Sequence, residues 1–295
     1  MRSTIATHHS LRLWLGAFAL LLGCVQQGIA AQGLIYRVYA GDTPRGYLVG
    51  TMHSEDLRVT GLLEQFEPLI EQVDVVAIEM VPDAITLMAV GASTLLPADQ
   101  SLRGLIGNRR FELLATAAEP LGLPREVLDR LKPWAAAVMM GMPLPQSGRF
   151  LDIEIYLRAL QLQRRVVGLE TAAEQLSVFE RMTPELQLVL LDEMVKNASN
   201  MPKQLEELTL AYLKGDLEQL DAVARGQYGE MPPAVMQWFD DQLLDQRNTR
   251  MLSRLSPLLE TGNLLVAVGA MHLAGETGLV AGLRRMGYRV ERWPG

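Results

Sequence analysis

The chain has 295 residues, of which 49% are hydrophobic and 21% charged, with one cysteine and a formal net charge of −7. This apolar fraction is that of an ordinary packed domain, so a disordered or collagen-like protein is excluded. A single cysteine excludes an internal disulfide and a site made of several thiolates. An acidic chain without a basic tract lacks the surface that nucleic-acid binding needs, so we expect no nucleic-acid partner.

The first thirty residues are typical of an export signal. Arg2 and Arg12 precede the apolar stretch 13–22, which is too short for a comfortable permanent membrane span, and this beginning contains no acidic residue. We therefore expect an exported protein, located in the periplasm or attached to the outer membrane of a Gram-negative-type envelope.

Two processing sites remain open for this leader. Small residues at 28–31 suit an ordinary signal peptidase and define a leader of residues 1–30. The sequence Leu-Leu-Gly-Cys at 21–24 resembles a bacterial lipobox and defines a lipoprotein signal of residues 1–23. In the second case Cys24 carries a lipid, which is the one membrane contact that we expect.

The remaining chain, 31–295, is predicted to be a single α/β domain. Short runs rich in β-branched residues recur between turn residues, and several are continuously apolar, as in strands covered on both faces. A turn at 41–44 predicts an antiparallel pair at the start of a mixed, mostly parallel central sheet flanked by helices. The predicted strands are 34–40, 47–50, 73–79, 166–170, 264–269 and 288–293.

Two long helical insertions are expected, at about 84–145 and 171–258, and they would form a cap on the sheet. Thr171 and Glu174 have the spacing of a capping box. Thr183 followed by Pro184 places a cap before a proline at the first helical position. A proline-rich break at 142–148 ends the first insertion.

His53 and His272 are the two histidines outside the leader, and they occur in nearly identical contexts. Each follows a predicted strand in a Gly-x-x-His motif, Gly50-Thr51-Met52-His53 and Gly269-Ala270-Met271-His272. The carboxyl ends of neighbouring parallel strands open into one crevice, so the two GxxH loops are expected to meet there. The two glycines would let the backbone turn through conformations that a Cβ disfavours.

Two further predicted strands end in a carboxylate, Glu79 and Glu170. Neutral imidazole and carboxylate are ligands for Zn²⁺, Mn²⁺ or Co²⁺, and a spare glutamate could act as a base on bound water. Any one of these four residues could instead be structural, because a histidine after a strand is commonly hydrogen-bonded and a strand-end glutamate commonly caps a helix. The repeated motif favours a shared metal-binding site.

Weaker candidates lie near this set. Asp152 is expected to cap the helix that starts near residue 151, or alternatively to accept a histidine N–H. Arg247 could hold a carboxylate or a substrate oxyanion, or lie on a solvated helix face. Met52 and Met271 are expected to pack rather than ligate, and Lys132-Pro133-Trp134 to kink and pack a helix.

At these residues the chain resembles the TraB/PrgY/GumN family, which is related to the Tiki metalloproteases and more distantly to erythromycin-esterase-like and ChaN-like proteins. The resemblance is closest to the exported GumN branch and covers roughly residues 34–293. It implies an α/β fold with repeated GxxH halves and, by analogy with Tiki, metal-dependent proteolysis that uses both histidines and the glutamates. The motifs that carry it are the two GxxH sequences, Glu79, Pro133-Trp134, 168–171 with Glu174-Gln175, Arg247-Asn248, and Leu273 followed by Gly275 and Gly278-Leu279.

The leading hypothesis is an exported metal-dependent hydrolase, a peptidase, acting on a peptide or small-molecule substrate. His53, His272 and one or both of Glu79 and Glu170 would bind the ion, a remaining carboxylate would activate water, and Arg247 or a backbone N–H would stabilise the oxyanion. A second hypothesis makes one histidine a general base for metal-independent ester hydrolysis. A third is a non-catalytic envelope protein that binds haem, iron or a peptide.

Overall fold

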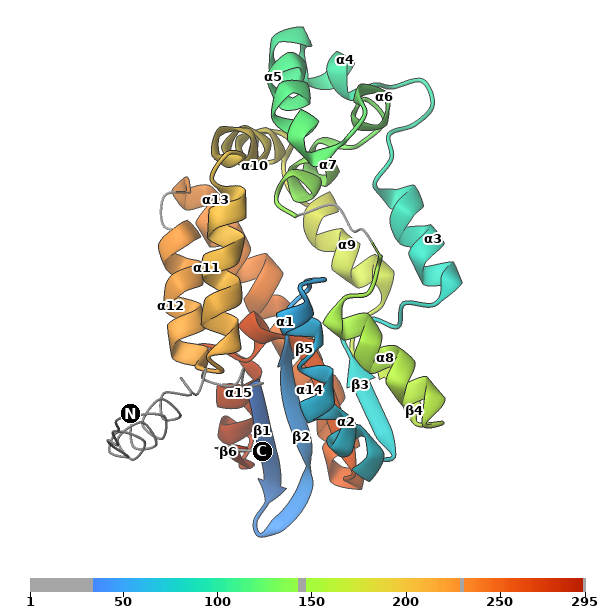
Figure 1. Cartoon of the computed structure of the whole chain (residues 1–295), viewed down its shortest axis with the longest axis vertical. Helices are drawn as coiled ribbons and strands as arrows, with labels where there is room; N and C mark the ends of the chain where they lie inside the picture. The colour runs from blue at the N-terminus through green and yellow to red at the C-terminus, as the bar shows by residue number, and fades with distance from the viewer. Residues whose placement is uncertain (1–33, 143–146, 229–230, 294–295) are drawn as a thin grey trace, which may run out of the picture. The chain divides into compact units, whose positions relative to one another are not determined.

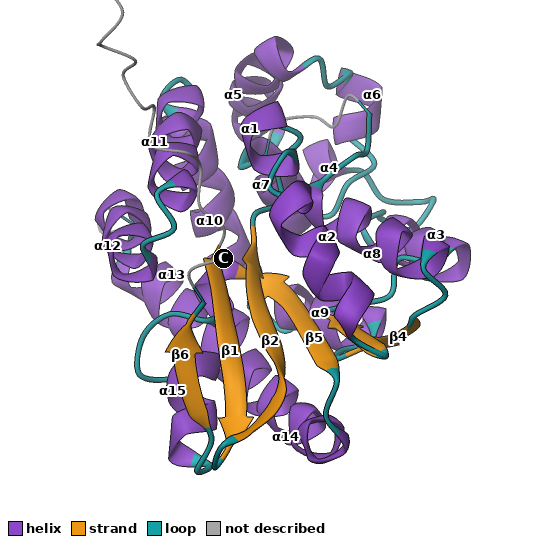
Figure 2. Cartoon of the chain, turned by 60° about the horizontal axis from the view of Figure 1, so that its bottom comes forward, coloured by secondary structure: helices purple, strands orange, loops and turns teal. Residues whose placement is uncertain are grey.

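The structure, a computed structural model, describes residues 34–142, 147–228 and 231–293. The predicted leader and both of its processing sites lie outside these residues, as does the central part of the predicted break at 142–148. The described residues form a mixed α/β unit in which helices lie on both faces of a six-stranded sheet, as Figures 1 and 2 show.

The sheet has the strand order β4-β3-β5-β2-β1-β6. Its first four strands in this order are parallel, whereas β1 is antiparallel to both β2 and β6. The predicted mixed, mostly parallel sheet is confirmed, including the hairpin, whose turn begins at Gly41 with a positive φ of 58°. The strands are β1 Leu34–Ala40, β2 Thr43–Thr51, β3 Val75–Ile78, β4 Arg165–Gly168, β5 Leu264–Gly269 and β6 Arg289–Arg292.

Apolar side chains pack on both faces of the sheet. Along β2, Tyr47 and Val49 belong to one core, whereas Leu48 belongs to the other, because successive strand residues point to opposite faces. The first core contains helices α1 (Leu57–Thr60), α2 (Leu63–Gln72) and α8 (Leu151–Gln161). The second contains α14 (Gln246–Thr261) and α15 (Leu279–Arg285). Burial on both sides explains why the central strands β3 and β5 are continuously apolar.

The two helical insertions share a third core of their own. It joins residues of the first insertion, such as Phe111 and Trp134, to residues of the second, such as Leu191 and Val235. The pairing of α7 with α10 is the densest helix–helix contact in this part. The first insertion contains α3 Ala84–Ser93, α4 Leu102–Ile106, α5 Asn108–Ala118, a 3₁₀ turn Glu119–Leu121, α6 Arg125–Leu128 and α7 Pro133–Met140.

The second insertion leads through a π-helical segment into α14, which returns to the sheet. Among the helices of the described residues, none combines the length and the apolar composition that crossing a bilayer needs. The second insertion contains α9 Ala172–Glu180, α10 Pro184–Asn197, α11 Met201–Leu213, α12 Leu217–Tyr228, α13 Pro233–Trp238 and the π-helix Phe239–Asp245. A 3₁₀ turn, Ala270–His272, follows β5.

Both predicted helix starts are confirmed. The Thr171 side chain accepts from the Glu174 N–H while the Glu174 carboxylate accepts from the Thr171 N–H, which completes the capping box of α9. Thr183 caps α10 by accepting from the Leu186 N–H, and Pro184 occupies the first turn. These caps fix where the chain leaves β4 and where the second insertion begins.

We expect Thr171→Ala to lower the free energy of unfolding by about 0.5–2 kcal/mol, because it removes the hydroxyl that satisfies a free N–H of α9. Chemical denaturation would measure this. Thr116→Ala is the matched control, since Thr116 is exposed within α5, where alanine is the better helix former. An equal loss in both variants would show that the cap contributes nothing specific.

Candidate functional site

The two GxxH loops leave the same edge of the sheet from neighbouring strands. β2 and β5 are parallel and in register, with Thr51 opposite Gly269, so His53 and His272 follow that pair by two and three residues. β3 lies on the other side of β5 and β4 beyond it, and Glu79 and Glu170 follow these strands. All four predicted residues therefore start from one edge, as the parallel topology requires.

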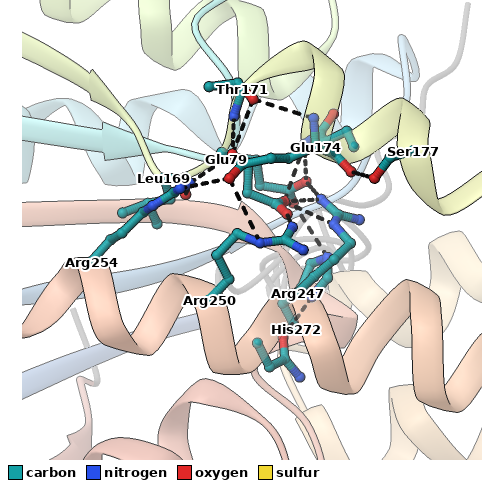
Figure 3. Close-up of polar contacts among 12 residues, drawn as sticks. Glu79, Leu169, Thr171, Glu174, Ser177, Arg247, Arg250, Arg254 and His272 are labelled. Carbon is teal, nitrogen blue, oxygen red and sulfur yellow. Dashed lines mark hydrogen bonds and ion pairs between the residues drawn. The ribbon is translucent and has the colours of Figure 1, made fainter.

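Arg247 joins the two glutamates at this edge. Figure 3 labels Arg247 and one of them, Glu79. Arg247 Nη2 donates to Glu79 Oε2 at 2.6 Å, and its Nε donates to Glu170 Oε2 at 2.8 Å. Arg247 is a buried residue, so its guanidinium depends on these carboxylates for compensation. Of the two alternatives for Arg247, the structure shows the carboxylate clamp and not the solvated helix face.

Two further arginines of α14 extend this network. Arg250 Nη1 donates to Glu170 Oε1 at 2.6 Å. Arg254 makes two hydrogen bonds to the Glu174 carboxylate, and both residues are labelled in Figure 3. Sequence reasoning missed Arg250 and Arg254, although their spacing from Arg247 places all three on one helix face. Each glutamate thus has an arginine partner, and both oxygens of Glu170, whose side chain is 0% exposed, are occupied.

His272 lies beside Glu79 with its tautomer fixed. The ring is buried, and its Nδ1 lies 2.7 Å from Asn248 Oδ1. An amide oxygen only accepts, so Nδ1 carries the proton and Nε2 keeps its lone pair. Burial lowers the pKa of His272, against the raising effect of Glu79, so the imidazole is neutral at pH 7.

Nε2 of His272 faces Glu79 Oε1 at 3.9 Å. Burial raises the pKa of Glu79, but His272, Arg247 and the Gly269 N–H together lower it to about 2, so this carboxylate is ionised. A lone pair and a carboxylate oxygen thus face each other without a proton between them. The Glu79 side chain is also 25% exposed, so of the two predicted glutamates it is the accessible one.

The glycines of the two motifs are needed for space and not for an unusual φ, which corrects the prediction. Gly269 has φ −50°, and its N–H donates to Glu79 Oε1 at 2.6 Å. A Cβ there would lie 3.2 Å from that oxygen, and one on Gly50 would lie 3.0 Å from Leu273 Cδ1. Neither glycine has a positive φ. Close approach of neighbouring groups therefore explains both.

His53 has different neighbours from His272. Its side chain is 52% exposed, its ring stacks on Phe150 with centroids 3.8 Å apart, and its Nδ1 lies 3.6 Å from Asp152 Oδ2. Within the described ranges, no hydrogen bond or ion pair connects His53 to Glu79, Glu170, Arg247 or His272. The structure thus brings the last four residues together and places His53 on the adjacent loop with partners of its own.

Asp152 does not cap α8, so the capping prediction is wrong. The N-cap is Phe150, and the helix start has no side-chain cap. Asp152 instead accepts a hydrogen bond from the Thr51 hydroxyl and faces His53. The competing interaction is tertiary, because β2 brings the Thr51 hydroxyl to the first turn of α8.

The remaining weak candidates have structural roles. Met52 and Met271 pack against the first core, as predicted. Pro133 begins α7 and therefore does not kink it, and Trp134 is buried and stacks on Phe179 with centroids 5.1 Å apart. The packing prediction for this segment is confirmed, whereas the kink is not found.

Glu79 and His272 fit a divalent metal as a pair of ligands. One is an ionised carboxylate and the other a neutral imidazole with a free Nε2, and divalent transition metals take both kinds of ligand. Glu170 does not fit, since arginines hold both of its oxygens. Among the residues that the structure describes, no group of three or more His, Cys, Asp or Glu side chains is arranged to hold a metal.

These features define an α/β protein with duplicated GxxH loops and an arginine-clamped pair of glutamates at the carboxyl edge of its sheet. Residues 34–292 match the TraB/PrgY/gumN family, and the chain belongs to that family. This agrees with the resemblance inferred from the motifs.

Two relatives illustrate how far the likeness extends. The chain is 24% identical over 194 residues to the uncharacterized protein YbaP of Escherichia coli strain K12, covering 64% of this chain and 70% of YbaP. It is also 24% identical over 309 aligned positions to the metalloprotease TIKI1 of Danio rerio, covering 85% of this chain and 61% of that protein. No solved structure matches the chain.

From the Glu174–Arg254 pair we predict that part of the free energy of unfolding is lost in acid. The Arg254 guanidinium lowers the pKa of Glu174 from 4.5 to about 2. A lowered carboxyl pKa stabilises the folded state fully above the unfolded-state value, and this contribution is lost as the pH falls from there towards 2. We expect the fall in unfolding free energy between about pH 6 and pH 2 to be smaller in Glu174→Gln than in the wild type.

Denaturant titrations at several pH values would measure this difference. Glu64→Gln is the control, because Glu64 is exposed and has no ion pair among the described residues. Identical acid limbs for the wild type and Glu174→Gln would refute the assignment.

Arg247→Leu is expected to lower the free energy of unfolding by about 3–5 kcal/mol, because it leaves buried carboxylates without their shared counter-charge. Arg109→Leu, at an exposed arginine of α5, is expected to change it by no more than about 0.5 kcal/mol. Thermal and denaturant unfolding would provide both values. A cost for Arg247→Leu below about 1 kcal/mol would mean that Glu79 and Glu170 do not depend on this clamp.

Proposed function

We propose that this protein is an exported metal-dependent hydrolase that cleaves peptides. The observation that carries the proposal is the pair of opposed acceptors, His272 Nε2 and Glu79 Oε1, which face each other at 3.9 Å at the edge of the sheet. A divalent cation would accept both groups as ligands, because both present lone pairs. Membership of the family and similarity to a protein named as a metalloprotease support the same chemistry.

Glu79 and His272 would hold the ion, and His53 from the adjacent GxxH loop would be the third ligand. When bound, the ion would polarise the scissile carbonyl and make a coordinated water more acidic. Asn248 keeps the His272 proton on Nδ1, so Nε2 is always available. The Gly269 N–H and Arg247 hold Glu79 in place and ionised.

Arg247 and Glu170 would act by holding other side chains of the site in place. The Arg247 side chain is 9% exposed and is bound to two carboxylates, which leaves it little access to a substrate oxyanion. Glu170 orients Arg247 and Arg250, and its buried carboxylate balances their charge. We therefore assign the ligand role to the accessible carboxylate, Glu79, and a positioning role to Glu170.

The metal-independent ester hydrolase is the second candidate, and one observation favours it. His272 is neutral at pH 7 and has a free Nε2, which are also the requirements of a general base. A strong chelator separates the two, since it would abolish a metal-dependent activity and leave the activity of a histidine base intact.

We expect the purified wild type to contain a transition metal, and Glu79→Gln and His272→Gln to lose both the metal and the cleavage of a metal-supplemented peptide library. Asn248→Ala should weaken metal binding by about 10- to 100-fold, because it releases the His272 tautomer. Elemental analysis and mass spectrometry of the cleaved library would measure these effects, with Glu64→Gln as the control that keeps both.

Two results would contradict the proposal. One is wild-type protein that binds no transition metal after supplementation. The other is metal occupancy that is unchanged in Glu79→Gln and His272→Gln. A Soret band on haem titration that disappears in the histidine variants would support the non-catalytic binding protein instead.

A further inference from the structure

We propose that Asp152 is the positioning residue of His53, and that its buried carboxylate oxygen accepts the Nδ1–H of that imidazole so that Nε2 is the nitrogen presented for chemistry. The effect on metal binding rests on the proposed function, in which His53 is the third ligand. The contact itself is argued from the described contacts of Asp152, Thr51, Phe150 and His53.

The first observation is an unsatisfied oxygen. Asp152 Oδ1 accepts from the Thr51 hydroxyl, but Oδ2 is buried and has no hydrogen-bond partner among the described residues. A buried carboxylate oxygen without a donor costs free energy, so a native structure provides one. His53 Nδ1, 3.6 Å from Oδ2, is positioned to be that donor. A small rotation of the imidazole would bring this contact into the range of a hydrogen bond.

The second observation is that other contacts restrict this rotation. The His53 ring stacks on Phe150 at an interplanar angle of 16°, which limits how far the ring can tilt. Glu55, two residues after His53, accepts from the backbone N–H groups of Ser147 and Gly148. The segment 147–152 therefore contacts the stretch 53–55 at three points, through the Glu55 carboxylate, the Phe150 ring and the Asp152 oxygen.

The third observation is that a side-chain oxygen faces the same nitrogen in both GxxH loops. Nδ1 of His272 is bound by Asn248 from α14, and Nδ1 of His53 faces Asp152 from α8. These two helices lie in the cores on opposite faces of the sheet. Each loop thus receives a side-chain oxygen from a different helix, and in each the Nε2 atom is left free. The two partners differ in charge, since one is an amide and the other a carboxylate.

A carboxylate partner changes how a histidine acts as a metal ligand. An imidazole whose Nδ1–H is held by a carboxylate is fixed in orientation and is a more basic ligand through Nε2. His53 is half-exposed, so without Asp152 its ring would sample both tautomers and more than one orientation. Asp152 would therefore act through His53 and need not touch the substrate.

The tautomer of His53 can be measured directly by long-range ¹H–¹⁵N correlation of the imidazole rings in the full-length protein at about pH 9, where imidazole is neutral. His53→Gln and His272→Gln assign the signals. We expect His53 of the wild type to be protonated on Nδ1. In Asp152→Ala it should revert to the Nε2–H form that free imidazole favours, with His272 unchanged.

Two matched variants make the test specific. Asp152→Asn should keep the Nδ1–H form, because the amide oxygen can accept from His53 while the Thr51 hydroxyl accepts from the amide nitrogen. Asn248→Ala should shift the tautomer of His272 and leave His53 as it is. For metal binding, Asp152→Ala should lower affinity by about 10- to 100-fold, and Asp152→Asn by less.

Wild-type His53 protonated on Nε2 would overturn the proposal, and this measurement needs no variant of Asp152 that folds. A tautomer that does not change in Asp152→Ala would overturn it as well. The result is independent of hydrolysis. If the protein binds no metal and cleaves no peptide, the proposed function fails, yet an Nδ1–H tautomer that depends on Asp152 would still establish the positioning contact.

Discussion

The site depends on one interaction, the clamp that Arg247 forms between Glu79 and Glu170. These carboxylates follow adjacent strands, β3 and β4, and like charges so close together in a buried setting repel each other. The Arg247 guanidinium lies between them, and Arg250 binds the remaining oxygen of Glu170, so two negative charges meet two positive ones. Acidic residues can therefore follow these strands directly, next to the apolar core, because their charges are compensated.

The clamp also explains why the two glutamates have different surroundings. Arginines occupy both oxygens of Glu170, which is the inner residue and serves as the counter-charge. Glu79 gives one oxygen to Arg247 and directs the other towards the Gly269 N–H and His272. A buried ion pair is often no more stable than an apolar replacement, so its value here lies in the orientation and ionisation that it gives Glu79.

The duplicated GxxH motif supplies two similar loops, and the helices around the sheet make them different. His272 is buried beside the clamp and bound by a neutral amide. His53 is half-exposed and is framed by the segment that leads into α8. A site assembled from both loops therefore needs the packing of α8 and α14 on opposite faces of one sheet. A change in either core would alter the position of a histidine partner.

Local sequence was sufficient to predict much of the fold and the edge of the sheet at which the site lies. The six predicted strands were found within a few residues, and the capping box at Thr171 and Glu174 formed as expected, because β-strand patterning and helix capping depend on neighbours in the chain. The GxxH repeat likewise indicated the strand ends and, with Glu79, Glu170 and Arg247, the family.

The partners across the sheet were decided by the tertiary structure. Arg250 lies 80 residues from Glu170, and Thr51 lies 101 residues from Asp152, so no local pattern reports these contacts. For Asp152 the local rule favoured a helix cap. Its carboxylate instead accepts from the hydroxyl of Thr51 in β2. Spacing along the chain sets which residues reach an edge of the sheet, whereas the packing of helices against that edge sets which atom of each residue remains free.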